Sequence, residues 1–367
     1  MKAQRILVVL DDCGPGDALR VHFCLQAIRE RYPQASLDLL VGEQAESIFE
    51  GQQLFDHVMV SGLYGLRSSS RWRLAIRKSV QAVRLAFRLG RVYDLAFTFY
   101  WGTSLLDLLV RIATRGPAYG YANAWAALVD GGLGRYRIEA GAIVQAVRLV
   151  GAAGITATCP EPLRRPPQSR LAAEPGYLVP ALPIVLHPGS DWACQMWPAE
   201  RWAELADRLH AEIGGSLVFT GSAGEVADVE RIRALMRAPS VSLAGQTTVA
   251  ELAAVLAGAV LCVCVDSLVY ELAQTAGTPT VVLAGESRTR PDVAGKGAPI
   301  VVNRTSPELR AAILDCKLSH AKAAFGGCLD WSCPMAGLRS IRVTDVVAAA
   351  LARLEATSRV AAGATGL

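Results

Sequence analysis

Short apolar runs alternate with amphipathic stretches along most of the chain. In the first half these runs predict strands, at residues 5–10, 36–41, 57–60 and 95–99. Helical spacing between them predicts helices at about 17–32 and 45–52. In the second half the apolar runs predict strands at residues 183–187, 216–220, 241–244, 260–265 and 280–283. Strands that alternate with helices in this way are typical of α/β proteins with a parallel sheet covered on both faces.

A proline-rich stretch separates the two halves. Residues 159–183 contain seven prolines, which disfavour both helix and strand. The sequence therefore predicts two Rossmann-like, doubly wound domains that face each other across a cleft. We place the first domain at residues 1–165, the linker at 166–183 and the second domain at 184–342.

Composition supports a globular protein. Of the 367 residues, 52% are hydrophobic and 19% are charged, and the longest apolar run, at 252–265, is too short to cross a bilayer. The N-terminus enters a strand without a cleavage site for a signal peptide. The nine cysteines follow no disulfide framework. We expect reduced thiols and a cytoplasmic location, with a place at the inner face of the membrane as an open alternative.

One cysteine cluster could in principle hold a metal. Cys316, Cys328 and Cys333 lie in the same region as His320, but they lack the Cys-x2-Cys spacing of a zinc site. We therefore expect no metal.

The net charge of +4 is unevenly distributed. Eight Lys or Arg residues and no acidic residue lie between Arg67 and Arg91. On a helix, the arginines of this segment form a stripe beside apolar residues that include Phe87. Two interpretations stay open: a solvated face, or a surface for an anionic acceptor or an anionic membrane. Nothing in the sequence indicates nucleic-acid binding.

The segment 184–198 is the strongest candidate site. A buried strand ends at His187, the chain turns at Pro188-Gly189, and a helix is predicted to begin at Pro198. Loops between a strand and the positive N-terminus of a helix often hold phosphates in α/β proteins, although an ordinary connection has the same local pattern.

Other strand ends carry polar loops as well. In the first half, Gly14, Gly16 and Asp17 form a turn before a helix, without the third glycine of a dinucleotide-binding fingerprint. Asp17 by itself could be a helix cap or a base. In the second half, residues 220–225 and 266–267 follow strands. Several such loops at the carboxyl ends of strands indicate a ligand site.

The order of these motifs resembles glycosyltransferase family 9, the bacterial heptosyltransferase group, over nearly the whole chain. The matching segments are Gly16-Asp17-Ala-Leu, 32–41, 93–97, His187-Pro-Gly189 with Trp197-Pro198, Thr220-Gly221, 243–247, Asp266-Ser267 and 277–281. This resemblance implies a GT-B fold and inverting transfer of a sugar from a nucleoside diphosphate sugar, typically ADP-heptose, without a metal or other cofactor. It also implies that a helix at about 343–360 returns to the first domain.

The resemblance assigns roles residue by residue. Asp17 matches the general base, Glu225 an acid that binds the ribose, and residues 243–247 a segment that lines the nucleotide base. The donor-binding residues are then Gly189, Ser190, Asp191, Gln195, Thr220, Gly221, Glu225, Leu243, Gly245, Thr247, Asp266, Ser267, Leu268, Tyr270 and Arg288. Residues expected to bind the acceptor are Asp12, Gly16, Arg67 and Arg71.

The chain also departs from the family pattern around the expected donor site. Gln195 stands where relatives have a lysine that neutralises the diphosphate, and Asp191 replaces a hydroxyl residue. The signature Asp-Ser-Gly-x-x-His becomes Asp-Ser-Leu268-Val-Tyr270. Arg288, together with Arg290, is the expected substitute for the missing positive charge.

These observations predict an inverting glycosyltransferase with an unusual donor or acceptor. Its expected partners are a nucleotide sugar, with an ADP-sugar as the expected donor, and a glycan, lipopolysaccharide core or natural-product acceptor. The alternative is a catalytically degenerate relative that binds or scaffolds. A sugar-nucleotide 2-epimerase lacks the expected acid and histidine set, and a nicotinamide dehydrogenase is disfavoured by the incomplete glycine fingerprint.

Overall fold

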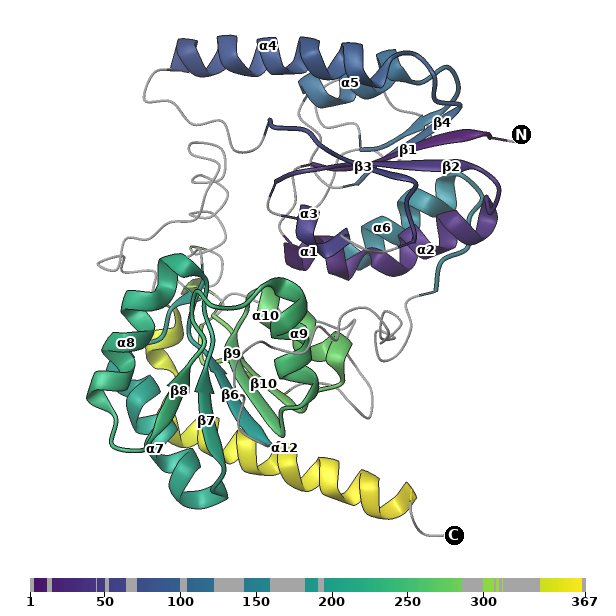
Figure 1. Cartoon of the computed structure of the whole chain (residues 1–367). Coiled ribbons are helices and arrows are strands. Elements are labelled where there is room, and N and C mark those ends of the chain that lie inside the picture. The colour runs from purple at the N-terminus through teal and green to yellow at the C-terminus, as the bar shows by residue number, and fades with distance from the viewer. Residues whose placement is uncertain are drawn as a thin grey trace. The chain divides into compact units, whose positions relative to one another are not determined.

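The computed structural model of the chain divides into two compact units, Met1–Pro160 and Glu161–Leu367 (Figure 1). The division lies at the beginning of the proline-rich stretch. The structure describes residues 3–11, 15–43, 45–49, 53–63, 71–99, 104–121, 142–158, 182–190, 195–285, 300–306, 308–309, 312 and 337–364.

The first unit contains a parallel sheet of five strands in the order β3-β2-β1-β4-β5. The strands are β1 (Arg5–Leu10), β2 (Ser36–Val41), β3 (His57–Val60), β4 (Leu95–Thr98) and β5 (Ala118–Tyr119). The central strand β1 pairs with β2 on one side and with β4 on the other, so that Ile6 lies opposite both Leu37 and Leu95. Residues 6–10 of this strand are buried, as expected for a strand covered on both faces.

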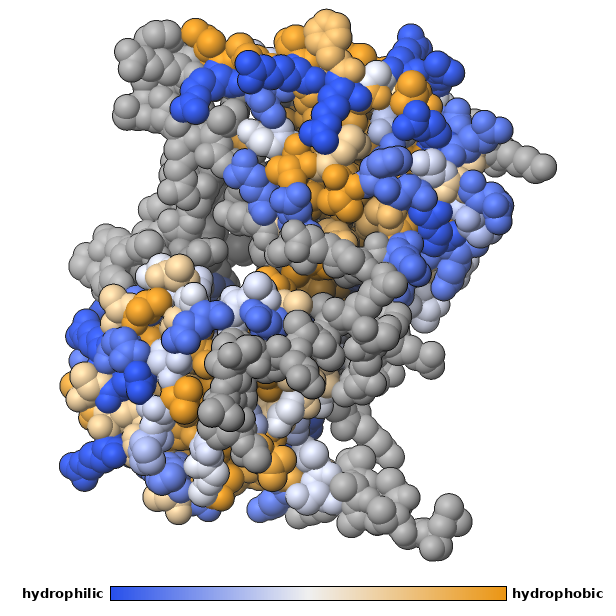
Figure 2. Space-filling model, in the orientation of Figure 1, coloured by the Kyte–Doolittle hydropathy of each residue, from blue (hydrophilic) through white to orange (hydrophobic). Residues whose placement is uncertain are grey.

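Helices cover both faces of this sheet. They are α1 (Pro15–Arg20), α2 (His22–Arg31), α3 (Glu46–Phe49), α4 (Arg71–Leu89), α5 (Ser104–Ala113) and α6 (Ala142–Ala152). One face, with Leu7 and Val9 of β1, packs against α4 and α5. The other four helices contact one another on the opposite side. The outer side of α4 leaves apolar residues on the surface (Figure 2).

Asp38 joins the amino-terminal ends of the strands in this unit. Its side chain is buried and accepts a hydrogen bond from Arg5 Nη2 at 3.2 Å and one from Tyr93 OH at 2.8 Å. His57 Nδ1 lies 3.0 Å from the same carboxylate. Burial, together with the Asp38 carboxylate, raises the pKa of Tyr93, so that the phenol stays protonated and donates. Several charged and polar partners thus satisfy a carboxylate that would be costly to bury alone.

The second unit contains a parallel sheet of six strands in the order β11-β10-β9-β6-β7-β8. The strands are β6 (Pro183–His187), β7 (Ser216–Phe219), β8 (Ser240–Ser242), β9 (Leu261–Val265), β10 (Thr280–Leu283) and β11 (Ile300–Val302). The central strand β6 is buried throughout and pairs with β7 and β9.

The helices of this unit divide between the two faces of the sheet. They are α7 (Ala199–Ile213), α8 (Val226–Leu235), α9 (Val249–Ala257), α10 (Leu268–Ala276) and α12 (Val343–Ala364), with short 3₁₀ helices η4 (Ala223–Glu225) and η6 (Gly337–Ser340). Alternate strand residues such as Ile184 and Leu186 share a core with α7, α8 and α12. Helices α9 and α10 contact each other outside that core.

Two tryptophans connect the beginning of α7 to the segment before α12. The rings of Trp197 and Trp202 pack edge to face at 5.3 Å. Trp197 Nε1 donates to the carbonyl of Ile341 at 3.1 Å, and Arg201 Nη1 donates to the same carbonyl at 2.6 Å. The residues that follow Trp197-Pro198 are therefore held against a segment about 140 positions later in the chain.

The first turns of α12 pack in the core of the second unit. Val343, Val346, Val347 and Ala350 are buried there, because their spacing places them on one side of the helix. The expected return of the helix at about 343–360 to the first domain stays a prediction.

Most predicted strands are present within a residue or two, and three details differ. The predicted helix 17–32 is two helices that meet at Val21, whose ψ of 2° is not helical. Pro198 is the residue before α7 and is extended, with φ −55° and ψ 139°. Strands β5 and β11 were not predicted. A capping box begins α9, since Thr248 Oγ1 accepts from Glu251 N and Glu251 Oε2 accepts from Thr248 N.

Within the described part of the chain, no helix is long and apolar enough to cross a bilayer. The described cysteines, Cys24, Cys262 and Cys264, are buried, and no disulfide joins them to one another. Residues 313–336, which include Cys316, Cys328 and Cys333, lie outside the described residues. Among the described residues, no three His, Cys, Asp or Glu side chains form a group that could hold a metal.

The buried carboxyl group of Asp107 makes the stability of the first unit depend on pH. It is 5% exposed in the first turn of α5, and burial raises its pKa from 3.8 to about 6. The folded state holds this proton more tightly than the unfolded state, so stability falls as pH rises from 3.8 through about 6.

We expect Asp107→Asn to raise the melting temperature at about pH 8 and to have little effect below about pH 4. Thermal unfolding at several pH values measures this, with the exposed Glu30→Gln as the control. A gain that is the same at all pH values would contradict the explanation.

Candidate functional site

The loop after β6 lies at the edge where the strands of the second sheet end. Because β6, β7 and β9 are parallel neighbours, His187, Thr220 and Asp266 follow or close these strands at the same edge. His187 Nδ1 lies 3.0 Å from Thr220 Oγ1, and both residues are buried. Burial lowers the pKa of His187, although the negative charge of Glu225 opposes this shift. A neutral imidazole thus connects the ends of β6 and β7.

Gly189 is in direct contact with Glu225. A Cβ atom added to Gly189 would lie 2.1 Å from Glu225 Oε1, far closer than any van der Waals contact allows. Glu225 Oε2 also accepts a hydrogen bond from Ser222 N at 2.6 Å, within a capping box that starts η4. Only glycine at position 189 lets the loop after β6 approach the carboxylate of Glu225 this closely.

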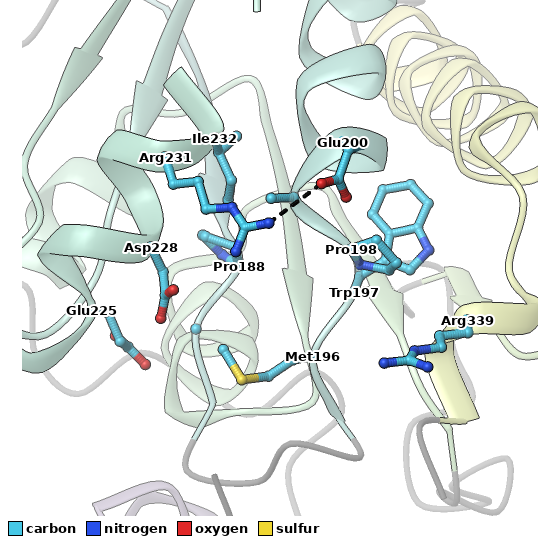
Figure 3. Close-up of a pocket in the computed structure, with 12 residues that line it drawn as sticks. Pro188, Met196, Trp197, Pro198, Glu200, Glu225, Asp228, Arg231, Ile232 and Arg339 are labelled. Carbon is cyan, nitrogen blue, oxygen red and sulfur yellow. Dashed lines mark hydrogen bonds and ion pairs between the residues drawn. The ribbon is translucent and has the colours of Figure 1, made fainter. Parts of the chain in front are cut away.

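A pocket of about 410 Å³ opens beside this contact (Figure 3). Glu225, Asp228 and Arg231 line one side, and Trp197 and Arg339 line another. Arg231 Nη2 forms a 3.4 Å ion pair with Glu200 Oε1, and both side chains are largely exposed to solvent. Carboxylates accept hydrogen bonds from sugar hydroxyls, and guanidinium groups bind phosphates. The pocket therefore combines the two kinds of group that a sugar nucleotide requires.

Gln195, at the position where the resemblance leads one to expect lysine, is buried in the same loop. Ser190 Oγ donates to Gln195 Oε1 at 2.8 Å, and Ser190 is also buried. The side chain of Gln195 is thus held inside the loop by a neutral hydrogen bond. Where the family resemblance predicts the positive charge of a lysine, this chain has the uncharged hydrogen-bonded pair of Ser190 and Gln195.

The loops after β7 and β8 are held together by their backbones. Leu243 N donates to the carbonyl of Phe219, and Gly245 N donates to the carbonyl of Gly221. Gly245 has a φ of +71°, a conformation that favours glycine, and an added Cβ would lie 3.0 Å from Val226. Leu243 is buried and Thr247 is half-buried. The structure thus brings the predicted residues of 220–225 and 243–247 together.

The loop after β9 presents a hydroxyl group with unused hydrogen-bonding capacity. Asp266, Ser267 and Leu268 are half-buried, and Tyr270 is buried in α10. The Oγ atom of Ser267 is buried and has no hydrogen-bond partner in the described part of the structure. Leaving such a hydroxyl unpaired costs about 1–3 kcal/mol. A ligand that binds at this strand end would remove that cost.

In the first unit, Gly16 and Asp17 lie in α1, which follows β1. Asp17 is 39% exposed, and its Oδ1 accepts a hydrogen bond from Arg20 Nη1 at 3.0 Å. Asp11 directly follows β1 and is buried, and Ser61 Oγ donates to its carboxylate.

Several predicted residues lie outside the described residues. They are Asp12, Arg67, Asp191, Arg288 and Arg290. Arg71 is the first residue of α4, and only its backbone is described.

Sequence reasoning missed the two arginines of the pocket. Arg231 lies three residues after Asp228 on α8, and this helical spacing could have indicated it. Arg339 has no such signal, because it precedes α12 and reaches the pocket only through the packing of η6 on α7. Its backbone carbonyl accepts a hydrogen bond from Arg201 at 2.5 Å.

Comparisons with known proteins agree with this architecture. Residues 165–306 match the family model described as glycosyltransferase family 9 (heptosyltransferase). Lipopolysaccharide heptosyltransferase 1 of Pseudomonas aeruginosa is 39% identical over 120 residues, which span 31% of this chain and 30% of that protein.

Two solved structures share the fold. A family 9 glycosyl transferase from Veillonella parvula has a TM-score of 0.69 and 18% identity, and the match covers 96% of this chain and 97% of that one. E. coli heptosyltransferase WaaC with ADP-2-deoxy-2-fluoro heptose has a TM-score of 0.62 and 18% identity, with coverage of 86% and 99%. The predicted fold of two doubly wound α/β units is confirmed.

The contact between Gly189 and Glu225 can be tested by a double-mutant cycle. In Gly189→Ala the new Cβ should displace the Glu225 carboxylate, at a cost on the order of 1 kcal/mol in the free energy of unfolding, because the carboxylate ends a flexible side chain. The cost should largely disappear in the Glu225→Ala background. Urea unfolding measures both values.

Gly224→Ala is the matched control, since an added Cβ there meets only Ser222 Oγ at 3.9 Å. Equal costs of Gly189→Ala in the two backgrounds would refute the direct contact.

Proposed function

Because residues 165–306 match the family model of glycosyltransferase family 9, we propose that the chain is an inverting glycosyltransferase. It would transfer a sugar, heptose or a related one, from a nucleoside diphosphate sugar to an acceptor hydroxyl. The observation that carries this proposal is the position of the family match, which includes every strand-end loop of the second unit from β6 to β10.

The second unit is the proposed donor-binding part. Glu225 and Asp228 would accept hydrogen bonds from hydroxyls of the ribose, and Ser267 Oγ would gain a partner at the neighbouring strand end. We propose an ADP-sugar as donor, because the structurally similar heptosyltransferase WaaC was solved with an ADP-heptose analogue. No metal or other cofactor takes part in this proposal.

Asp17 is the proposed general base. As the acceptor oxygen attacks the anomeric carbon, the bond to the nucleoside diphosphate breaks on the opposite face and the diphosphate leaves with the electron pair. Asp17 takes the proton of the attacking hydroxyl. The guanidinium of Arg20, 3.0 Å away, orients the carboxylate for this transfer.

The acceptor is proposed as a hydroxyl of a glycan, a lipopolysaccharide core or a natural product, reached at the inner face of a membrane. A second candidate function follows from one observation. The neutral, buried pair of Ser190 and Gln195 supplies no charge for a diphosphate. A relative that binds glycans or nucleotides without catalysis would tolerate this change.

A donor panel separates the two functions. The full chain is incubated with ADP-, UDP-, GDP- and CDP-sugars, and release of nucleoside diphosphate is measured with and without candidate acceptors. Acceptor-dependent release supports the transferase. Binding of a nucleotide, seen as a shift in melting temperature without release for any acceptor, favours the non-catalytic relative. No shift with any nucleotide would refute the proposed donor site.

Asp17→Asn tests the role of the base. We expect kcat to fall about 10²- to 10⁴-fold, because the amide cannot accept the proton, while the Kd for ADP measured by calorimetry stays unchanged. Glu30→Gln, which removes an exposed carboxylate on α2, is the control. A kcat of Asp17→Asn close to that of Glu30→Gln would remove Asp17 from the mechanism.

A further inference from the structure

Helix α4 exposes an unusual amount of apolar surface. Its inner side packs in the core of the first unit through Ala82, Leu85 and Leu89. Its outer side carries four apolar residues that are about half exposed or more, namely Ile76 (55%), Val80 (47%), Val83 (56%) and Phe87 (85%). Apolar side chains gather over this helix on the molecular surface (Figure 2). A patch of this kind marks a binding surface more often than a solvated one.

The four apolar residues form one continuous stripe. At about 100° per residue, they fall within an arc of about 60° on the helix. With a rise of about 1.5 Å per residue, the stripe extends about 16 Å from Ile76 to Phe87. It is therefore a linear apolar edge that runs along the outer side of the helix.

A second stripe, of arginines, lies directly beside the first. The exposed side chains of Arg77, Arg84 and Arg88 occupy the next arc of about 40° around the helix. No acidic residue occurs between Arg67 and Arg91 in the sequence. The nearest acid on the adjoining helix, Asp107 of α5, is buried. The outer side of α4 is thus apolar along one edge and positively charged along the other.

This arrangement has the properties of a helix that lies in the interface of a bilayer. Such helices insert an apolar edge at the level of the upper acyl chains and place Lys or Arg beside the phosphates of anionic lipids. Both the apolar edge and the basic residues are needed. The apolar side chains insert into the bilayer, and the basic residues are attracted to its negative surface. A second copy of the chain would bring a stripe of like charge and suits the arginines less well.

We propose that the outer side of α4, with Ile76, Val80, Val83 and Phe87 as the inserting edge and Arg77, Arg84 and Arg88 as the lipid phosphate contacts, docks on an anionic membrane. This inference gives the proposed membrane contact a defined surface. It does not depend on sugar transfer, because the readout below is lipid binding by the full chain without donor or acceptor.

Vesicle sedimentation tests the proposal. The full chain is mixed with vesicles of phosphatidylcholine alone or of phosphatidylcholine and phosphatidylglycerol. We expect binding to the anionic vesicles only, and weaker binding at high salt. Binding that is equal for both vesicle types, or absent for both, would overturn the proposal.

Two double variants separate the contributions of the stripes. Val83→Ser with Phe87→Ser should weaken binding to anionic vesicles about tenfold or more, since the largest inserting side chain is lost. Arg84→Gln with Arg88→Gln should weaken it by a similar factor and reduce its salt dependence. Because all four residues are exposed, both variants should keep the melting temperature of the parent chain.

Matched controls are Val144→Ser on α6, which is 50% exposed, and Arg31→Gln on α2, which is exposed. Neither should change vesicle binding. If the stripe variants bind vesicles like the parent chain but change its sedimentation coefficient, α4 joins copies of the chain and the membrane proposal is wrong. Binding of single-stranded RNA in place of vesicles would also overturn it.

Discussion

The parallel pairing of β6 with β7 and β9 is the constraint on which the candidate site depends. Parallel neighbours end at the same edge, so the loops after β7 and β9 each begin one strand spacing from the loop after β6, although all three are far apart in the sequence. The buried contact between His187 and Thr220 then fixes the ends of the first two strands. A change that broke this pairing would separate the loops, whatever their own residues.

Close packing of these loops limits which residues can occupy them. Glycine at 189 permits the approach of the Glu225 carboxylate, and glycine at 245 permits a left-handed turn against Val226. Within the same loop, Ser190 and Gln195 satisfy each other without a charge. The positive groups that line the pocket come instead from α8 and from the segment before α12. Among the described residues, packing between elements therefore brings these positive groups to the pocket.

In the first unit, the buried polar network and the exposed side chains lie in different places. The network around Asp38 lies at the amino-terminal ends of its strands, where it holds buried charge without a ligand. Asp17 lies beyond the carboxyl end of β1, on a partly exposed helix. Helix α4 packs its inner side in the core and exposes apolar residues on its outer side. Exposure to solvent therefore increases from the buried Asp38, through the partly exposed Asp17, to the outer side of α4.

The sequence alone determined most strands, several helices, the family resemblance and the loops that carry polar groups. These features depend on apolar periodicity and on turn residues, and both signals can be read within one short segment of the chain. Local patterns could not predict the break at Val21, strand β11 or the extended conformation of Pro198, because packing against other elements decides them.

Only the tertiary structure decided which side chains meet. Arg339 reaches the pocket because Trp197 and Arg201 bind the carbonyl of Ile341, a contact with no trace in local sequence. The sequence showed both stripes of α4, but not which of its sides is buried in the core. Burial and distance arise when segments far apart in the chain pack together, and no single segment determines them.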